Sequence, residues 1–165
     1  MPRLAGLGRM LQANECQRTM ATPLRILVVE DDPDDTLLLQ RAFASAPSHV
    51  PIHYVQDGQE AIDFLKAQPP FDNPIEQPLP TLVLLDLKMP RMDGFDVLEW
   101  LWRQPGQSRI VAVVFSSSNQ REDINRAYAL GARSYFVKPA DPSQFIDIVR
   151  QLQSYWLEHN VLPGD

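Results

Sequence analysis

Residues 82–94 read LVLLDLKMPRMDG, and their pattern of apolar, acidic and turn residues indicates the class of fold. Its first four residues form a wholly apolar run, which is typical of a strand buried on both faces of a parallel sheet. The run ends at Asp86, and a turn that closes at Gly94 leads into a helix, which we expect from Phe95 to about Arg103. The stretch therefore predicts a buried strand, an acidic residue at its carboxyl end and a helix that follows directly.

Similar units lie on both sides of this stretch. Four more strands are predicted, at Arg25–Val29, Ile52–Val55, Ile110–Phe115 and Ser134–Val137. Each is followed by residues with the periodicity of an amphipathic helix. Gly131 is expected to end one of these helices, and Asp141 with Pro142 to start the last, whose apolar stripe runs to Trp156. Five such units in a row predict an α/β fold, with a doubly wound five-stranded parallel sheet and five helices.

The composition indicates one globular domain. The chain has 165 residues, of which 44% are hydrophobic, which is enough for a core. We place the domain at 23–158, between an N-terminal extension at 1–22, expected to be flexible, and a C-terminal tail at 159–165. No apolar run approaches the roughly 20 residues that span a bilayer. The only cysteine, Cys16, leaves no intramolecular disulfide, so we expect a cytoplasmic protein that makes no contact with the membrane.

The carboxyl ends of the predicted strands carry the residues with the most distinctive chemistry. In doubly wound sheets ligands bind beyond these ends, so residues that follow different strands are expected to converge. Strands one, three, four and five end at Glu30 with Asp31, Asp86, Ser116 and Lys138. Carboxylates this close repel one another unless a hard cation such as Mg²⁺ binds between them, while an ammonium and a hydroxyl suit phosphoryl oxygens. The set predicts a Mg²⁺-dependent phosphoryl-transfer site with a carboxylate nucleophile.

Four segments carry a resemblance to a known family. They are ILVVEDDP at 26–33, LVLLDLKMPRMDG at 82–94, VVFSSS at 113–118 and GARSYFVKP at 131–139. In this order and at these spacings, the chain from about Leu24 to Trp156 resembles the receiver domain of two-component response regulators. The resemblance implies the flavodoxin-like receiver fold, in which the strand order is 2-1-3-4-5.

The resemblance also implies roles within the site. Asp86 would be the phosphoacceptor, which receives a phosphoryl group from a sensor histidine kinase. Asp31 and Asp86 would ligate Mg²⁺ together with the backbone carbonyl of Lys88. Glu30, at a position where many receivers have Asp, would act through the water shell of the metal.

The switch that the resemblance implies responds to the new charge. A phosphoryl group carries about −1.5 to −2 of charge and three acceptor oxygens, and it would attract Lys138 and the hydroxyl of Ser116. Lys138 would be joined to Pro139 by a cis peptide bond. Tyr135, which matches the switch aromatic, would turn into the space that Ser116 leaves. The face made by the fourth helix, the fifth strand and the fifth helix would then change shape.

Two further pairs of residues flank the predicted site. Lys88 and Ser118 match positions that, in this family, tune how fast the acyl phosphate hydrolyses. Asp34 and Asp35 are expected to be the N-cap and a first-turn acid of the first helix rather than metal ligands.

The output is expected to be contact with another protein, whose identity the sequence does not name. Only residues 159–165 follow the last helix, which leaves no room for a DNA-binding or catalytic domain, and a net charge of −6 also argues against DNA. The tail and the Pro-rich loop at 68–80 resemble the small response regulators encoded beside bacterial phytochromes, which form homodimers. A phytochrome kinase and a C2 homodimer through the last helix and tail are thereby implied. The apolar residues of this region are Tyr155, Trp156, Leu157, Val161 and Leu162.

Two alternatives differ in chemistry. A receiver that only docks would keep the fold without accepting phosphate. A phosphatase of the haloacid-dehalogenase type would use Asp86 as nucleophile but needs a second Asp two residues later, where this chain has Lys88. We therefore expect no enzyme in the usual sense, but a signalling switch that catalyses only its own phosphorylation and dephosphorylation.

Overall fold

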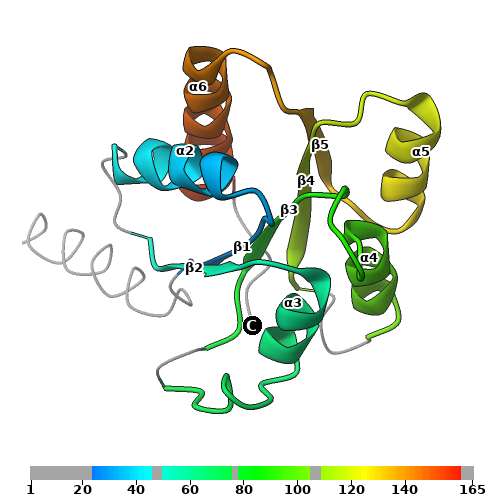
Figure 1. Ribbon diagram of the computed structural model, residues 1–165. Coiled ribbons are helices and arrows are strands. Elements are labelled where there is room, and N and C mark those ends of the chain that lie inside the picture. The colour runs from blue at the N-terminus through cyan, green and yellow to red at the C-terminus, as the bar shows by residue number, and fades with distance from the viewer. Residues whose placement is uncertain (1–23, 46–49, 76–77, 105–108, 161–165) are drawn as a thin grey trace, which may run out of the picture.

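The computed structural model describes residues 24–45, 50–75, 78–104 and 109–160 (Figure 1). Strands and helices alternate along the chain, and a short π-helix, η3, continues the last α-helix. The strands are β1 (Ile26–Val29), β2 (Ile52–Val55), β3 (Leu82–Leu85), β4 (Val111–Ser116) and β5 (Ser134–Val137). The helices are α2 (Pro33–Ala44), α3 (Gly58–Leu65), α4 (Gly94–Trp102), α5 (Arg121–Ala129), α6 (Pro142–Gln153) and η3 (Ser154–His159).

The five strands form one parallel sheet in the order β2-β1-β3-β4-β5, which confirms the expected fold and strand order. Val29 of β1 lies opposite Leu85 of β3, and Leu85 lies opposite Val114 of β4. Ser116, the last residue of β4, lies opposite Val137 of β5. Because the strands run in the same direction and their ends differ by at most two residues in register, the residues that follow them lie along one edge of the sheet.

Side chains that alternate along the strands fill two cores, one on each face of the sheet. Leu84 packs in the core that contains Phe145 of α6 and residues of α2. Leu85 packs in the other core, with Phe64 of α3, residues of α4 and Ala127 of α5. Figure 1 shows the same division, with α2 and α6 on one side of the sheet and the other three helices on the opposite side. Helices therefore cover both faces of the sheet.

The start of α2 differs from the prediction by two residues. Its N-cap is Asp32, whose Oδ1 accepts hydrogen bonds from the backbone N–H groups of Asp34 (2.8 Å) and Asp35 (3.2 Å). Pro33 occupies the first helical position, so the cap falls on the residue before it. Asp34 and Asp35 lie in the first turn, where a carboxylate interacts favourably with the helix dipole.

Other helix ends follow the predicted signals. Asp141 caps α6 and Pro142 is its first residue. Asp93 forms a capping box with Asp96 at the start of α4. Gly131 lies just after α5 with a φ of 91°, a left-handed conformation that a residue with a side chain adopts only with strain.

The π-helix η3 contributes one aromatic side chain to the core and one to the surface. Trp156, the last residue of the apolar stripe predicted for the final helix, is buried in the core with residues of α2 and α6. Tyr155 beside it has 56% of its surface exposed. Val161 and Leu162 lie outside the described residues, as does the predicted extension at 1–22.

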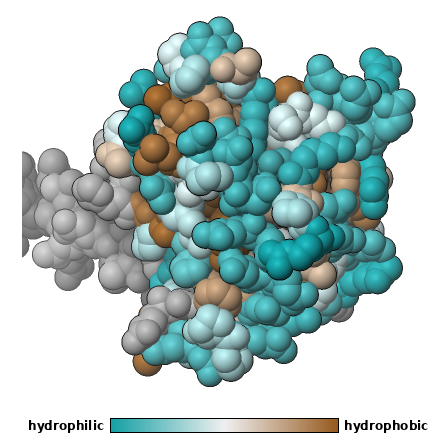
Figure 2. Space-filling view, in the orientation of Figure 1, coloured by the Kyte–Doolittle hydropathy of each residue, from teal (hydrophilic) through white to brown (hydrophobic). Residues whose placement is uncertain are grey.

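The face seen in Figure 2 is mostly hydrophilic, and hydrophobic side chains gather mainly near α2 and α6. Among the residues that the structure describes, no helix combines the length and the apolar character required to cross a membrane. Both observations agree with a chain that directs most of its apolar side chains into the two cores.

Candidate functional site

Three carboxylates converge at the carboxyl edge of the sheet. Oxygen atoms of Glu30, Asp31 and Asp86 all lie within 4.8 Å of one another. Glu30 and Asp86 are buried and Asp31 is partly exposed. Because β1 and β3 are neighbours in the sheet, residues 55 positions apart in the sequence meet here, which confirms the predicted convergence.

Lys138 brings the compensating positive charge. Its Nζ lies 2.6 Å from Glu30 Oε2, 2.9 Å from Asp86 Oδ2 and 2.9 Å from Asp35 Oδ2. Only 7% of the Lys138 side chain is exposed, so these ion pairs are shielded from water. The side chain that follows β5 therefore reaches the acids that follow β1 and β3.

The contact between Asp35 and Lys138 was not predicted. Asp35 lies in the first turn of α2, and its sequence position indicates a helix-dipole interaction only. The turn of α2 directs its carboxylate toward the ammonium instead. No pattern in the sequence distinguishes Asp35 from Asp34 in this respect.

Backbone contacts fix the position of Asp86. Its N–H donates to the carbonyl of Val29 (3.0 Å), and the N–H of Lys88 donates to its Oδ1 (3.1 Å). Gly94, at the start of α4, packs directly against the backbone at 86–87, where a Cβ atom would meet the carbonyl oxygen of Asp86. One carboxylate oxygen thus faces a backbone donor and the other faces Lys138.

The cluster shifts the pKa values of its members. Burial raises the pKa of Glu30 to about 7, although Lys138 acts in the opposite direction. Burial also raises the pKa of Asp31. For Lys138, burial would lower the pKa, but the carboxylates of Asp86 and Glu30 outweigh this effect and raise it. Near neutral pH Lys138 therefore stays charged, while Glu30 exchanges its proton.

Ser116 and Tyr135 lie beside the cluster but not in it. The Ser116 hydroxyl is fully buried and has no hydrogen-bond partner, whereas its carbonyl accepts from the N–H of Lys138 (2.8 Å). The Tyr135 hydroxyl donates to the carbonyl of Ser118 (2.8 Å). A buried hydroxyl without a hydrogen-bond partner is unusual. The Ser116 hydroxyl is therefore available to donate to an oxygen atom of a bound group.

The prediction of a cis peptide bond between Lys138 and Pro139 is wrong. In the described residues a cis bond joins Pro69 and Pro70, and the bond before Pro139 is trans. The trans form of an X–Pro bond is favoured by about 0.5–1 kcal/mol, and Lys138 reaches the acids with that geometry.

The two flanking residues, Lys88 and Ser118, share a partner that the sequence did not indicate. Lys88 Nζ lies 2.8 Å from Asp123 Oδ2, and the Ser118 hydroxyl donates to the same oxygen (2.5 Å). Asp123 is a first-turn acid of α5, a position that alone suggests only a favourable helix-dipole interaction.

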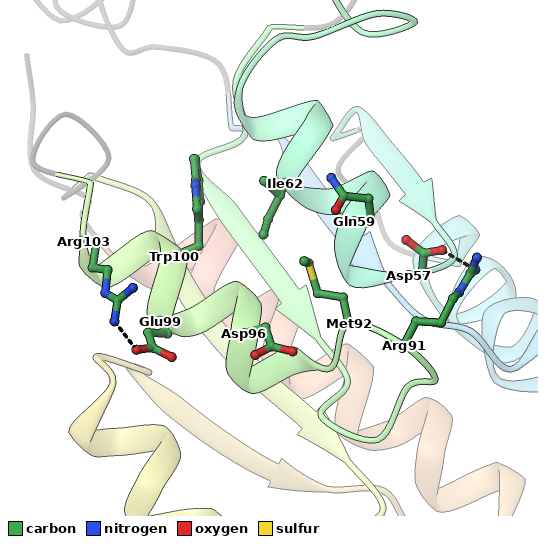
Figure 3. A pocket seen from close by; sticks show the side chains of 9 residues that line it. All are labelled: Asp57, Gln59, Ile62, Arg91, Met92, Asp96, Glu99, Trp100 and Arg103. Carbon is green, nitrogen blue, oxygen red and sulfur yellow. Dashed lines mark hydrogen bonds and ion pairs between the residues drawn. The ribbon is translucent and has the colours of Figure 1, made fainter.

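A surface groove of about 660 Å³ lies between α3 and α4, away from the acidic cluster (Figure 3). Ile62, Met92 and Trp100 line it, and the ion pair between Asp57 and Arg91 lies at its edge. None of the predicted site residues contributes to its lining. The groove is therefore separate from the site at the strand ends.

The carboxylate cluster fits a hard divalent cation. Its three oxygen donors come from two neighbouring strand ends, and one of them, Asp31, is partly open to solvent. Oxygen ligands of this kind are those that Mg²⁺ and Mn²⁺ prefer.

The comparisons with known proteins agree with this geometry. The profile of the response regulator receiver domain family matches residues 26–150. The chain belongs to this family, and its fold is that of a response regulator receiver domain.

Individual relatives indicate which kind of response regulator this chain resembles. Response regulator Rcp1 of Synechocystis sp. is 33% identical over 86% of this chain and 95% of its own length. The crystal structure of its Mn²⁺-bound form has a TM-score of 0.80 and covers 86% of this chain and all of that one. The phosphorylated cyanobacterial phytochrome response regulator RcpA is 34% identical, with a TM-score of 0.81 over 87% of this chain and all of that one. The chain therefore resembles phytochrome-associated response regulators along nearly their whole length.

One relative whose name describes a different role matches the same share of this chain. The probable methanogenesis regulatory protein FilR2 of Methanothrix harundinacea is 34% identical over 86% of this chain and 89% of its own length. Similar sequences of this size thus occur in proteins with different described roles.

Proposed function

We propose that this protein is a stand-alone phosphorylation switch, in which Asp86 accepts a phosphoryl group from a sensor histidine kinase. The observation that carries the proposal is the position of the Lys138 ammonium, 2.9 Å from the Asp86 carboxylate within a cluster of acids. Buried ammonium and carboxylate groups at this distance suit the transfer of an anionic group. The protein would act in the cytoplasm and change its contacts with another protein.

The transfer is a displacement at phosphorus. A carboxylate oxygen of Asp86 forms the new P–O bond, the P–N bond to the kinase histidine breaks, and its electron pair stays on the imidazole nitrogen. Lys138 pairs with the phosphoryl oxygens, and the unpartnered Ser116 hydroxyl donates to one of them. Hydrolysis of the acyl phosphate later restores the carboxylate. In this scheme the protein catalyses only its own phosphorylation and dephosphorylation.

Mg²⁺ is the cation that we assign to the site. Asp31, Asp86 and the carbonyl of Lys88 would hold it, with Glu30 acting through water. When bound, the ion neutralises negative charge on the transferred group. The acidic cluster and the Mn²⁺-bound structure of Rcp1 support this assignment.

Incubation with acetyl phosphate and Mg²⁺ tests the function. The intact mass of the wild-type protein should rise by one phosphate, and Asp86→Asn should abolish the gain. Asp72→Asn, at an exposed position in the loop before β3, is the matched control and should leave it unchanged. Absence of phosphate on the wild type would favour the docking receiver, and continuous release of phosphate from added phosphomonoesters would favour the phosphatase.

Magnesium affinity should depend on pH because Glu30 exchanges its proton near neutrality. Burial raises its pKa to about 7, so the carboxyl is mostly neutral at lower pH and mostly charged at higher pH. The affinity for Mg²⁺ should therefore rise about tenfold between pH 6 and 8. Isothermal titration calorimetry in two buffers with different ionisation enthalpies measures both the affinity and the released proton. In Glu30→Gln the rise should be lost, and a wild-type affinity independent of pH would contradict the prediction.

The buried Ser116 hydroxyl should cost stability until the phosphoryl group arrives. An unsatisfied buried hydroxyl costs about 1–3 kcal/mol, so Ser116→Ala should raise the free energy of unfolding of the unphosphorylated protein by about 1 kcal/mol. The stabilisation that phosphorylation brings should be smaller in this variant than in the wild type. Urea denaturation with and without acetyl phosphate measures both. Ser116→Thr keeps the hydroxyl and should not show the gain in stability, and a destabilised Ser116→Ala would show that the hydroxyl has a partner.

We also propose that the cognate kinase is a phytochrome. The similarity to the phytochrome response regulator RcpA supports this partner. A phytochrome histidine kinase from the same genome, once autophosphorylated, should transfer its phosphate to the wild type but not to Asp86→Asn. Retention of the phosphate on that kinase would point to a kinase with another sensor.

A C2 homodimer through α6 and the C-terminal tail remains a prediction. The exposed Tyr155 ring on η3 supports it, whereas Trp156 is buried within its own chain. Light scattering at micromolar concentration should give the mass of two chains. A monomer both with and without phosphate would contradict it.

A further inference from the structure

A second group of polar side chains belongs to the segments that follow β3 and β4 and consists of Lys88, Ser118 and Asp123. Lys88 Nζ is 2.8 Å from Asp123 Oδ2, and the Ser118 hydroxyl donates to that same oxygen (2.5 Å). The carbonyl of Ser118 accepts from the Tyr135 hydroxyl (2.8 Å). One oxygen of Asp123 therefore joins the loop that follows Asp86 to the segment that contacts Tyr135.

Asp123 is committed to these two partners. The hydrogen bond from Lys88, and then that from Ser118, lowers the pKa of its carboxyl, so the group is charged at neutral pH. The N-cap of α5, Gln120, makes no side-chain capping bond of its own. Ser118 is buried, and the Asp123 side chain is 19% exposed. Asp123 and Ser118 are thus the less exposed members of the group.

Lys88 is the most exposed member of the group. Its side chain is 53% exposed, and an ion pair this open to water is weak. Its backbone N–H already donates to Asp86 Oδ1 (3.1 Å), so the ammonium belongs to the residue two positions after the phosphoacceptor. A phosphoryl group on Asp86 would carry up to about two negative charges and three acceptor oxygens. It would compete with the single charge of Asp123 for this ammonium.

We propose that Asp123 is a positioning residue: it holds Lys88 at the start of α5 until a phosphoryl group on Asp86 attracts the ammonium away. Loss of the ion pair removes the cation from the hydrogen-bonded pair of Asp123 and Ser118, and Tyr135, bound to the Ser118 carbonyl, responds. The inference rests on the proposed phosphorylation of Asp86. It adds to the Ser116 hydroxyl a second connection between the phosphoryl group and Tyr135.

Acetyl phosphate kinetics test the position of Lys88. In Asp123→Asn the ammonium is free to attract the anionic donor, so the half-saturating concentration of acetyl phosphate should fall about two- to fivefold. Glu122→Gln removes an equal charge from an exposed neighbouring position on the same helix and should have no such effect. In a Lys88→Gln background, Asp123→Asn should change nothing. A fall that persists without Lys88 would show simple charge repulsion and would overturn the proposal.

A separate measurement tests the proposed connection between Asp123 and Tyr135. With 3-fluorotyrosine in the protein, the ¹⁹F resonance of Tyr135, assigned through Tyr135→Phe, reports the environment of its ring. In unphosphorylated Asp123→Asn this resonance should move toward its position in the phosphorylated wild type. A resonance that stays at the unphosphorylated position in this variant would overturn the connection to Tyr135.

The two proposals fail in different ways. If the wild type gains no phosphate, the proposed function is wrong and the role of Asp123 falls with it. If the wild type gains phosphate while Asp123→Asn matches it in both measurements, only the role of Asp123 is wrong.

Discussion

Replacement of Lys138 by methionine is expected to slow phosphate uptake from acetyl phosphate by about 100- to 1,000-fold. Lys138 is the cation within 2.9 Å of Asp86, and a preorganised group that contacts developing charge contributes on this scale. Methionine keeps much of the length of the side chain and removes the charge. The rate is measured from intact mass against time. Lys66→Met, at an exposed position, is the matched control and should keep the wild-type rate.

The same substitution should destabilise the fold in a pH-dependent way. Loss of one partner from a buried ion pair costs about 3–5 kcal/mol. Lys138 lowers the pKa of Glu30 against the effect of burial, so without the ammonium the folded pKa of Glu30 rises further above its unfolded value. Groups of this kind favour the folded state below their unfolded pKa and lose that contribution as pH rises through the folded pKa. The decrease in the free energy of unfolding caused by Lys138→Met should therefore be larger at pH 8 than at pH 6.

Magnesium binding distinguishes a lost charge from a lost fold. Removal of the ammonium leaves the acids with less positive charge nearby, so Lys138→Met should bind Mg²⁺ more tightly than the wild type while taking up phosphate more slowly. Weaker binding of Mg²⁺ together with slow uptake would mean that the cluster itself has been disrupted.

Replacement of Gly94 by alanine is expected to destabilise the protein by about 3 kcal/mol or more, because the new methyl has no space. A Cβ atom there would meet the carbonyl oxygen of Asp86 and lie 2.8 Å from the Cα of Leu87, both parts of the backbone. Helix propensity predicts the opposite sign, since alanine is better than glycine in a helix by about 1 kcal/mol. The clash is the larger effect, because backbone cannot rotate out of the way as a side chain can.

Urea denaturation measures the loss, and phosphate uptake shows where it acts. Because the methyl would push on the backbone of Asp86, any folded Gly94→Ala should also take up phosphate more slowly. Gln144→Ala, in the exposed first turn of α6, controls for alanine near a helix start and should be nearly neutral. A Gly94→Ala protein as stable as the wild type would show that α4 can shift without affecting Asp86.

The predicted parts of the site share one property: they follow from local sequence. Apolar runs that stop at Glu30 and Asp86 mark strand ends, and parallel strands bring their ends to one edge. Lys138 follows the same rule at the end of β5. These signals are strong because burial on both faces of the sheet requires apolar strands and excludes charge until the strand ends.

The missed contacts depend on the directions of helices. Asp35 and Asp123 are first-turn acids of α2 and α5, and nothing in the sequence separates them from Asp34 or Glu122. Only the packing of each helix against the sheet decides which acid reaches Lys138 or Lys88. The geometry of the bond before Pro139 is a similar case, because an X–Pro sequence permits both isomers.

The site is assembled from segments far apart in the chain, since 108 positions separate Glu30 from Lys138. An unfolded chain does not gather these oxygens, so a divalent ion would bind the native state alone and act as a thermodynamic ligand of folding. At a free concentration 100 times its dissociation constant, such a ligand adds about 2.7 kcal/mol to stability. We therefore expect the denaturation midpoint of this protein to rise with the magnesium concentration of the buffer and to fall when a chelator is added.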